Sequence, residues 1–393
     1  MRILYCVNFS DWWGNYPPDI LDREDGPTVG GGEAGALNTA FQLAALGHEV
    51  TYCSVAQPGT HKGVTFCSLN DYARIYATEG PWDAILSWSS SAPLRFVTGN
   101  EARLLVQQLN DVAYPWGWWD YTDMLVSPSW THAKFMAAYI PKSAGLAQYA
   151  VGNGADLTLF PTPVPDPSTR PMQVGWWSSP DRGLHHVLRV WPIIKRRVPT
   201  ARLKVFYQVR KYIDRAPFWS GRGSLLGTVL SRLLAKTEGL DVELVDQIPR
   251  RILAREQMQT RVQGYICDPE GFTEGFATSI LEAAAAGCLP VTRPIDALPE
   301  LWDGIVRWVT PDPMDADFDE AIVENIVYGL TTWADDPDRQ PSVATLRQRA
   351  EQWPWSTVGR EMEIAIRKAI EIRQQKGSPD VGNKPIPSYL VGI

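Results

Sequence analysis

Two glutamates, Glu274 and Glu282, are the residues of this sequence whose types and spacing point to the most specific chemistry. The alanine-rich stretch from Ala277 to Ala286 predicts a helix, and the turn into it begins at Glu274. The first backbone N–H groups of a helix are unpaired and lie at the positive end of its dipole, so a phosphate binds well there. Gly275 lets a ligand approach the backbone closely, and two carboxylates accept hydrogen bonds from sugar hydroxyls. A diphosphate together with hydroxyls describes a nucleotide-sugar.

The elements around these glutamates follow the order strand, loop, helix, strand. The apolar run from Val262 to Cys267 predicts a buried strand, Gly287 ends the helix, and Leu289 to Thr292 predicts the next strand. This order favours a parallel sheet with right-handed crossovers. A buried structural helix that carries two solvated or capping glutamates is the alternative interpretation of the same residues.

The spacing of the two glutamates resembles the E-x7-E signature of retaining glycosyltransferases of family 4. The segments that follow them are also similar: Ala283-Ala284-Ala285-Ala286-Gly287, then Pro290-Val291, then Glu300 in Leu298-Pro299-Glu300-Leu301. The resemblance implies the α/β GT-B fold, in which two Rossmann-like domains face each other across a cleft and a C-terminal helix crosses back to the N-terminal domain. It implies a metal-independent hexosyl- or pentosyltransferase that moves a sugar from a nucleoside diphosphate sugar to an acceptor hydroxyl.

The resemblance also implies roles for individual residues. Glu282 is expected to hold the ribose hydroxyls of the nucleotide, and Glu274 the hydroxyls of the transferred sugar. The diphosphate is expected at Arg182, at the turn Gly31-Gly32 and at the backbone of the helix start. The residues of that helix start are Gly275, Phe276, Ala277 and Thr278. Glu274, Arg182 and Asp111 are the predicted catalytic residues, and neither a metal nor a cofactor is expected besides the nucleotide-sugar co-substrate.

The N-terminal half has its own strand, glycine-rich turn, helix and strand. Arg2 to Asn8 predicts a buried strand, and Gly30-Gly31-Gly32 opens a helix that Gly47 closes. The turn lacks the G-x-G-x-x-G pattern with an acidic residue about 20 positions on, so a nicotinamide site is not predicted. It is similar to the family's Gly-Gly loop, and His48 behind the helix is predicted to be a structural surface histidine.

Candidate acceptor contacts follow a later strand of this half. Leu104 to Leu109 predicts a strand that ends in Asn110-Asp111, where relatives often carry a His-Asp pair. The run from Tyr114 to Tyr121 contains five aromatic residues. It predicts either a platform that stacks on a sugar or another ring, or a packed plug beneath the cleft.

The Pro-rich segment from Phe160 to Pro167 is the predicted connector between two domains. We therefore expect an N-terminal domain at 1–165, a C-terminal donor domain at 166–355, a crossover helix at 356–376 and a tail at 377–393. Relatives often carry an Arg and a Lys five residues apart on the donor side. Arg182 matches the second cation, whereas Trp177 stands in place of the first, and Arg210 and Lys211 are candidates to compensate.

Residues 195–236 combine basic side chains with leucines at helical spacing. This pattern favours a Rossmann helix whose apolar face covers the sheet; a helix that contacts a membrane surface or a polyanionic acceptor is the alternative. The whole chain, in contrast, has 393 residues and a net charge of −7, so it shows no general bias toward nucleic acid.

The cysteines and the lengths of the apolar runs indicate the cellular location of the protein. The five cysteines show no C-x-x-C spacing and are expected to be free thiols; they are Cys6, Cys53, Cys67, Cys267 and Cys288. No signal peptide is expected before the first strand, and no apolar run approaches the roughly 18 residues that span a bilayer. We expect a cytoplasmic enzyme whose acceptor is a glycan, a protein, a lipid-linked glycan or modified nucleic acid. A non-catalytic nucleotide-sugar-binding GT-B protein and a GT-B phosphorylase or epimerase are the alternatives.

Overall fold

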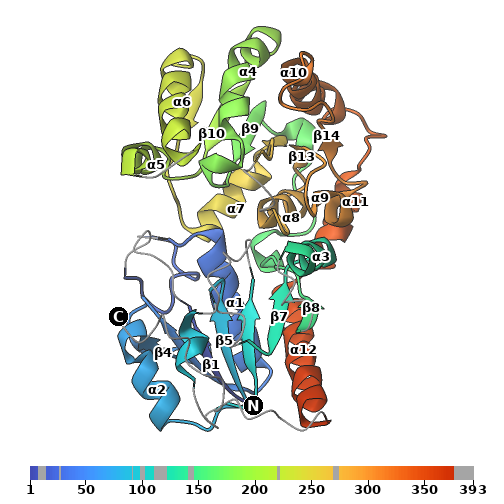
Figure 1. Ribbon diagram of the computed structural model, residues 1–393. Helices are drawn as coiled ribbons and strands as arrows, with labels where there is room; N and C mark the ends of the chain where they lie inside the picture. Colours follow the sequence, from blue (N-terminus) through green and yellow to red (C-terminus); the bar gives the residue numbers. More distant parts are fainter. Residues whose placement is uncertain are drawn as a thin grey trace. The chain divides into compact units, whose positions relative to one another are not determined.

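The computed structural model describes residues 1–7, 15–25, 28–90, 92–97, 102–109, 122–139, 146–218, 222–268 and 274–375. The chain divides into two compact units (Figure 1). Unit 1 comprises Met1–Ile20, Val29–Asn153 and Trp355–Ile393, and unit 2 comprises Leu21–Thr28 and Gly154–Pro354. Each unit has its own parallel sheet, so the predicted α/β class with two Rossmann-like domains is confirmed. The domain limits predicted at 165 and 355 stay predictions.

The described strands of unit 1 form a sheet in the order β3-β4-β2-β1-β5-β6-β7-β8, and every neighbouring pair except β3 with β4 is parallel. The bounds are β1 Arg2–Cys6, β2 Glu49–Ser54, β3 Gly59–His61, β4 Val64–Ser68, β5 Ala84–Trp88, β6 Leu105–Gln108, β7 Met124–Ser127 and β8 Ala147–Ala150. Strands β5, β6 and β7 are buried at every position, as expected for parallel strands that helices cover on both faces.

The α-helices described in unit 1 are α1 Gly31–Ala45, α2 Tyr72–Thr78, α3 Trp130–Tyr139 and α12 Trp355–Gln375. Helix α12 packs along α1, where a Cβ on Gly359 would overlap the side chain of Gln42, so only glycine allows this approach. Arg373 near its end forms an ion pair with Asp123. The C-terminal helix therefore crosses back to the N-terminal unit, as the resemblance implied.

The prediction for His48 is wrong, because this residue is buried. Only 7% of it is exposed; its Nδ1 lies 3.1 Å from the amino group of Met1 and its Nε2 lies 3.2 Å from Glu363 of α12. Burial and the nearby amino terminus lower the pKa of His48. The helix-to-strand junction thus lies under α12, a packing that the local sequence does not reveal.

The strands described in unit 2 are all parallel, in the order β11-β10-β9-β12-β13-β14. Their bounds are β9 Gln173–Trp176, β10 Arg202–Val205, β11 Val242–Leu244, β12 Val262–Gly264, β13 Leu289–Thr292 and β14 Arg307–Trp308. The α-helices described in this unit are α4 Leu184–Arg197, α5 Val209–Arg215, α6 Arg222–Lys236, α7 Arg250–Met258, α8 Thr278–Ala285, α9 Leu298–Trp302, α10 Phe318–Tyr328 and α11 Val343–Ala350. The predicted strand β12, helix α8 and strand β13 are present in this order.

The Pro-rich segment from Phe160 to Pro167 packs within unit 2. Phe160 is 3% exposed, and its carbonyl accepts a hydrogen bond of 2.9 Å from Arg347 of α11. Arg170, itself buried, donates to the carbonyls of Pro165, Thr260 and Ala286. Arginine donors thus bind the carbonyls of a segment in which prolines leave few backbone N–H groups.

Of the helices in the described ranges, none is both long and apolar enough to cross a bilayer.

Candidate functional site

Glu274 is fixed by its backbone as well as by its side chain. Its N–H donates to Asp296 Oδ2 at 3.0 Å, and its carbonyl accepts from the N–H of Ala297 at 3.2 Å. Both partners belong to the turn after β13, which is the neighbour of β12 in the sheet. Glu274 is 8% exposed, so its carboxylate is held in a defined place at the carboxyl ends of these strands. Ligands of parallel α/β sheets bind at this edge.

Tyr265 and Cys267 surround the Glu274 carboxylate. The Tyr265 hydroxyl donates a hydrogen bond to Glu274 Oε2, and Cys267 Sγ lies 3.9 Å from the same oxygen. Burial raises the pKa of both the Tyr265 hydroxyl and the Cys267 thiol well above their ordinary values, so both keep their protons. Glu274 Oε2 therefore accepts from two protonated donors, Tyr265 and Cys267, and these contacts orient the carboxylate.

Glu282 lies on α8 and is bound by two side chains of α7. Arg250 forms an ion pair with Oε1, and Gln257 Nε2 donates to Oε2 at 3.0 Å. Glu282 is 6% exposed. Each carboxylate oxygen has two lone-pair sites, so either oxygen can accept one further hydrogen bond from a ligand hydroxyl.

The first turn of α8 lies between the two glutamates. Ala277 has a left-handed backbone with φ of 61°, a conformation that costs a non-glycine residue about 1–2 kcal/mol. Helix α8 then begins at Thr278, and no side chain of the described residues caps it. Phe276 contributes only backbone, because its ring is buried against Trp302 and Trp353. The structure confirms the predicted helix start. The first N–H groups of a helix can bind an anion, and a phosphate here stays a prediction.

Arg182 ends a short 3₁₀ turn, η7 (Pro180–Arg182), before α4. The carbonyl of Arg182 accepts from the N–H of Asp268 at 3.3 Å, which brings the turn to the carboxyl end of β12. Gly183 has φ of 110°, and a Cβ there would overlap the Ile266 carbonyl, so glycine is required. The positive charge of Arg182 lowers the pKa of Cys267 and Tyr265, although burial outweighs it. Arg182 and Glu274 therefore belong to one local cluster.

Trp177, which stands where the resemblance implied a first cation, is a packing residue. It is 8% exposed, and its indole N–H donates to the carbonyl of Ser279 in α8 at 2.9 Å. Its ring covers Gly175 of β9. It therefore supports the first turn of α8 and supplies no charge.

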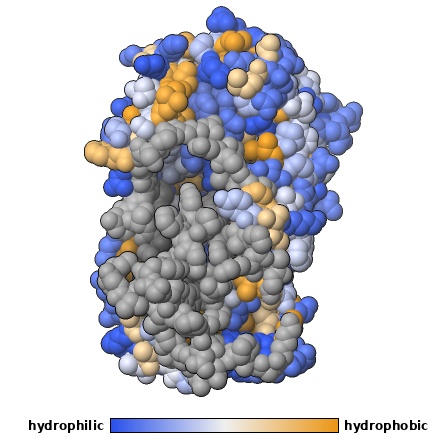
Figure 2. Space-filling model, viewed as in Figure 1, coloured by the Kyte–Doolittle hydropathy of each residue, from blue (hydrophilic) through white to orange (hydrophobic). Residues whose placement is uncertain are grey.

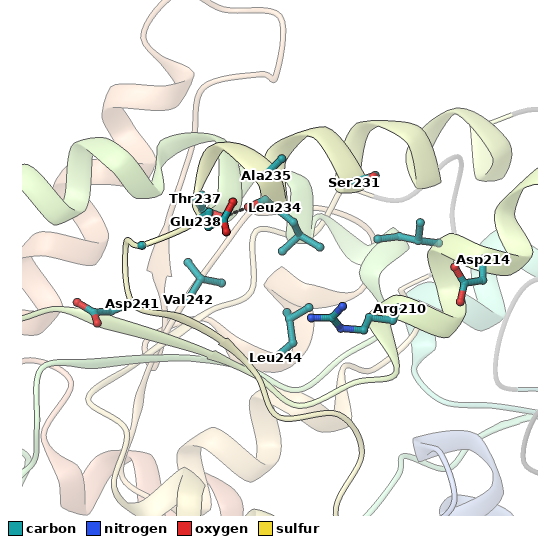
Figure 3. Close-up of a pocket in the computed structure, with 12 residues that line it drawn as sticks. Arg210, Asp214, Ser231, Leu234, Ala235, Thr237, Glu238, Asp241, Val242 and Leu244 are labelled. Carbon is teal, nitrogen blue, oxygen red and sulfur yellow. Dashed lines mark hydrogen bonds between the residues drawn. The ribbon is translucent and has the colours of Figure 1, made fainter.

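Arg210, a candidate to replace the missing cation, lines a separate groove. Figure 3 shows this groove between α5, the C-terminal half of α6 and β11. Its lining includes Asp214, Glu238 and Asp241, and none of the predicted donor-site residues. The cation that sequence reasoning missed is Arg250, which contacts Glu282 directly.

Three described side chains could hold a metal, namely His185, His186 and Asp268, whose ligand atoms lie within 4.8 Å of one another. Asp268 accepts from His186 Nε2 at 2.9 Å and from Arg293 at 2.8 Å. Because the arginine already supplies positive charge to this carboxylate, the residues fit an ion-pair network better than a divalent cation. The network anchors Asp268 at the end of β12.

The remaining predicted residues lie elsewhere. Gly31 and Gly32 begin α1 in unit 1, and a Cβ on Gly31 would meet no atom within 4 Å. Asp111 and the aromatic run 114–121 lie outside the described residues. Within the described part of unit 2, Arg182 and Glu274 lie near the carboxyl end of β12, and Glu282 lies in α8 one helix turn after its start.

The fold is that of the GT-B glycosyltransferases. No protein-family model matches the sequence, and no curated protein matches it significantly. Among solved structures, sucrose-phosphate synthase from Thermosynechococcus elongatus superposes with a TM-score of 0.68 at 13% identity, over 95% of this chain and 100% of that one. Anabaena HepE in complex with UDP-glucose gives 0.63 at 16% identity, over 94% and 100%. Trehalose 6-phosphate synthase from Burkholderia multivorans gives 0.63 at 11% identity, over 98% and 100%.

Proposed function

We propose that this chain is a retaining glycosyltransferase that moves a hexosyl or pentosyl group from a nucleoside diphosphate sugar to an acceptor hydroxyl. The observation that carries the proposal is the pair of buried, oriented carboxylates, Glu274 and Glu282, on either side of the uncapped start of α8. HepE, which shares the fold, has been solved with UDP-glucose. UDP is therefore the nucleotide that we propose to test first.

In this proposal Glu282 accepts hydrogen bonds from the ribose hydroxyls, and Arg250 and Gln257 keep its carboxylate in place. The diphosphate lies at the first turn of α8 near Arg182, with Gly31-Gly32 as a further contact. Negative charge develops on the leaving diphosphate during sugar transfer, so N–H groups and a cation placed there stabilise the transition state.

Glu274 holds the hydroxyls of the transferred sugar, and Tyr265 positions its carboxylate. Retention follows from attack on the same face of the sugar, assisted by an oxygen of the leaving phosphate. A covalent mechanism with two carboxylates is the alternative. Asp111 is proposed as a contact to the sugar or the acceptor. The proposal requires neither a metal nor a cofactor.

The test is turnover of UDP-glucose by the full chain with a panel of glycan, lipid-linked, protein and nucleic acid acceptors. NMR of the product's anomeric proton reports retention. Glu274→Ala is expected to lower turnover about a hundredfold, the loss typical of a group that stabilises the transition state. Glu238→Ala, an exposed glutamate outside the site, is the matched control. Equal turnover of Glu274→Ala and the unchanged chain contradicts the role of Glu274.

A non-catalytic nucleotide-sugar-binding protein is the second candidate, because Trp177 supplies no charge where the family carries a cation. That protein would bind UDP-glucose and release no UDP with any acceptor. A phosphorylase or an epimerase would show phosphate-dependent turnover or conversion of the donor without acceptor. A cytoplasmic location is proposed from the five thiols, of which all but Cys67 are buried.

A further inference from the structure

The outer face of α6 and the turn before it form an exposed surface that is apolar at one end and basic at the other. Leu225, Val229, Arg232 and Lys236 recur at every third or fourth position, so they lie in one row along the helix. Leu225 is 65% exposed, and Phe218 at the end of the 3₁₀ turn η8 (Ala216–Phe218) is 87% exposed. Figure 2 shows hydrophobic residues gathered over α6.

Helix α6 has two further faces, one packed against neighbouring helices and one that lines the groove of Figure 3. Leu226 and Leu230 are buried, and Gly227 lies so close to Ala216 that a Cβ would overlap it. This inner face packs against α4, α5 and η8 and fits the predicted Rossmann helix. A second face, with Leu234 and Ala235, lines the groove of Figure 3 beside Asp214 and Glu238. The row from Leu225 to Lys236 is a third face.

The charge of this region is opposite to that of the chain. Residues 209–236 contain six basic side chains and one acidic side chain, a local net charge of +5, whereas the other 365 residues together carry −12. Three basic residues just before this region form ion pairs within unit 2 and are left out of the surface: Lys195 with Asp241, Arg197 with Glu324, and Lys204 with Glu256.

We propose that Phe218 and the outer row of α6 dock this chain on a membrane surface that contains anionic lipids. Apolar side chains enter the boundary between headgroups and acyl chains while lysine and arginine pair with anionic headgroups. Nucleic acid phosphates would recruit the basic residues equally well. Phosphates do not bury the apolar side chains of Phe218 and Leu225. Exposure of these side chains to water is unfavourable unless an apolar phase covers them. A bilayer with anionic lipids binds both the apolar and the basic side chains.

Met314 supplies an internal comparison within unit 2. It is 91% exposed, which is more than Phe218, but Asp312, Asp315 and Asp317 flank it. An anionic surface repels these carboxylates. Exposure of an apolar side chain alone therefore does not define the docking surface, and Met314→Ser serves as the matched control.

The test is co-sedimentation of the full chain with two kinds of vesicle, phosphatidylcholine alone and equal parts of phosphatidylcholine and phosphatidylglycerol. We expect binding to the anionic vesicles only. Phe218→Ser combined with Leu225→Ser is expected to weaken binding about tenfold or more, because two apolar side chains no longer enter the boundary. Arg232→Glu combined with Lys236→Glu is expected to weaken binding about 25-fold or more, at about fivefold for each basic side chain. Met314→Ser is expected to bind as the unchanged chain does.

The proposal is overturned if the chain does not bind anionic vesicles, or binds neutral ones equally well. It is also overturned if Phe218→Ser with Leu225→Ser binds as tightly as Met314→Ser. Tight binding of a single-stranded oligonucleotide that depends on Arg232 and Lys236 but not on Phe218 would identify a polyanion site instead. All substituted side chains are exposed or partly exposed, so thermal unfolding of each variant should match that of the unchanged chain. Turnover of UDP-glucose with the acceptor panel is a separate readout, so failure of vesicle binding leaves the proposed activity untouched.

Discussion

Helices α1 and α8 each follow a strand of a parallel sheet along the chain, yet their starts are built differently. Helix α1 opens on Gly31 and Gly32, and space is open around Gly31. Helix α8 opens after the left-handed Ala277, between two buried carboxylates that α7 and the ends of neighbouring strands hold in place. The start of α1 has open space around Gly31, and its first turn carries one buried acidic side chain, Glu33. The start of α8 instead lies between two oriented carboxylates. A substitution should therefore be tolerated at Gly31 and costly around the start of α8.

The largest expected effect is on stability, at Gly183, the glycine after Arg182 that packs against the carboxyl end of β12. Gly183→Ala should lower the free energy of unfolding by about 3 kcal/mol, because it adds left-handed strain and an overlap with the Ile266 carbonyl. Gly31→Ala should change it by no more than about 0.5 kcal/mol, since a Cβ there meets no atom. Urea unfolding of both variants measures the difference. Equal losses of unfolding free energy in the two variants would contradict the difference between the two helix starts.

The next effect concerns turnover. Tyr265→Phe removes the hydroxyl that binds Glu274, so kcat should fall about tenfold while the dissociation constant of UDP stays the same. Tyr5→Phe is a matched control in unit 1, because the Tyr5 hydroxyl is also buried and donates to Gln108 at 2.8 Å. Both variants should lose about 1 kcal/mol of stability, and only Tyr265→Phe should lose turnover. If both lose turnover alike, Tyr265 is a structural residue and does not position Glu274.

The smallest effect is a pH dependence at the network that anchors Asp268. Burial lowers the pKa of His186 from its ordinary value of 6.5; Asp268 raises it, and Arg189 and Arg293 lower it. As pH falls, the unfolded chain takes up this proton first, so the free energy of unfolding should decrease from about pH 6.5 downward until the folded-state pKa is reached. In His186→Gln, the midpoint temperature of thermal unfolding should fall less steeply between pH 7 and the lower pH values than it does in the unchanged chain. An unchanged slope would exclude His186 as the titrating group.

The sequence was sufficient to predict the elements that position the site. Alanines predicted α8, Gly287 predicted its end, and apolar runs predicted β12 and β13, because each of these signals is local. The same holds for the glycines before α1. The long α12 was expected on the N-terminal unit through the family resemblance, and the structure confirms it.

The partners of the two glutamates could not be predicted from the sequence. Arg250 and Gln257 precede Glu282 by 32 and 25 residues, and Asp296 follows Glu274 by 22. Parallel strands bring these side chains to one edge only after the sheet has formed, so no local pattern marks them. Tyr265 carried a weak signal, as a single hydroxyl near the end of an apolar run. Trp177 was conspicuous as a missing cation, but its packing on Gly175 required the structure.

The most direct test of the central claim, that unit 2 binds the nucleotide-sugar at the start of α8, is calorimetry with UDP, GDP, ADP and TDP. We expect one nucleotide, UDP in the first instance, to bind selectively. Glu282→Ala should weaken that binding by about tenfold or more, because a charge-assisted hydrogen bond is lost. Glu238→Ala should bind as the unchanged chain does. Binding of no nucleotide, or equal affinity of Glu282→Ala and the unchanged chain, would contradict the account.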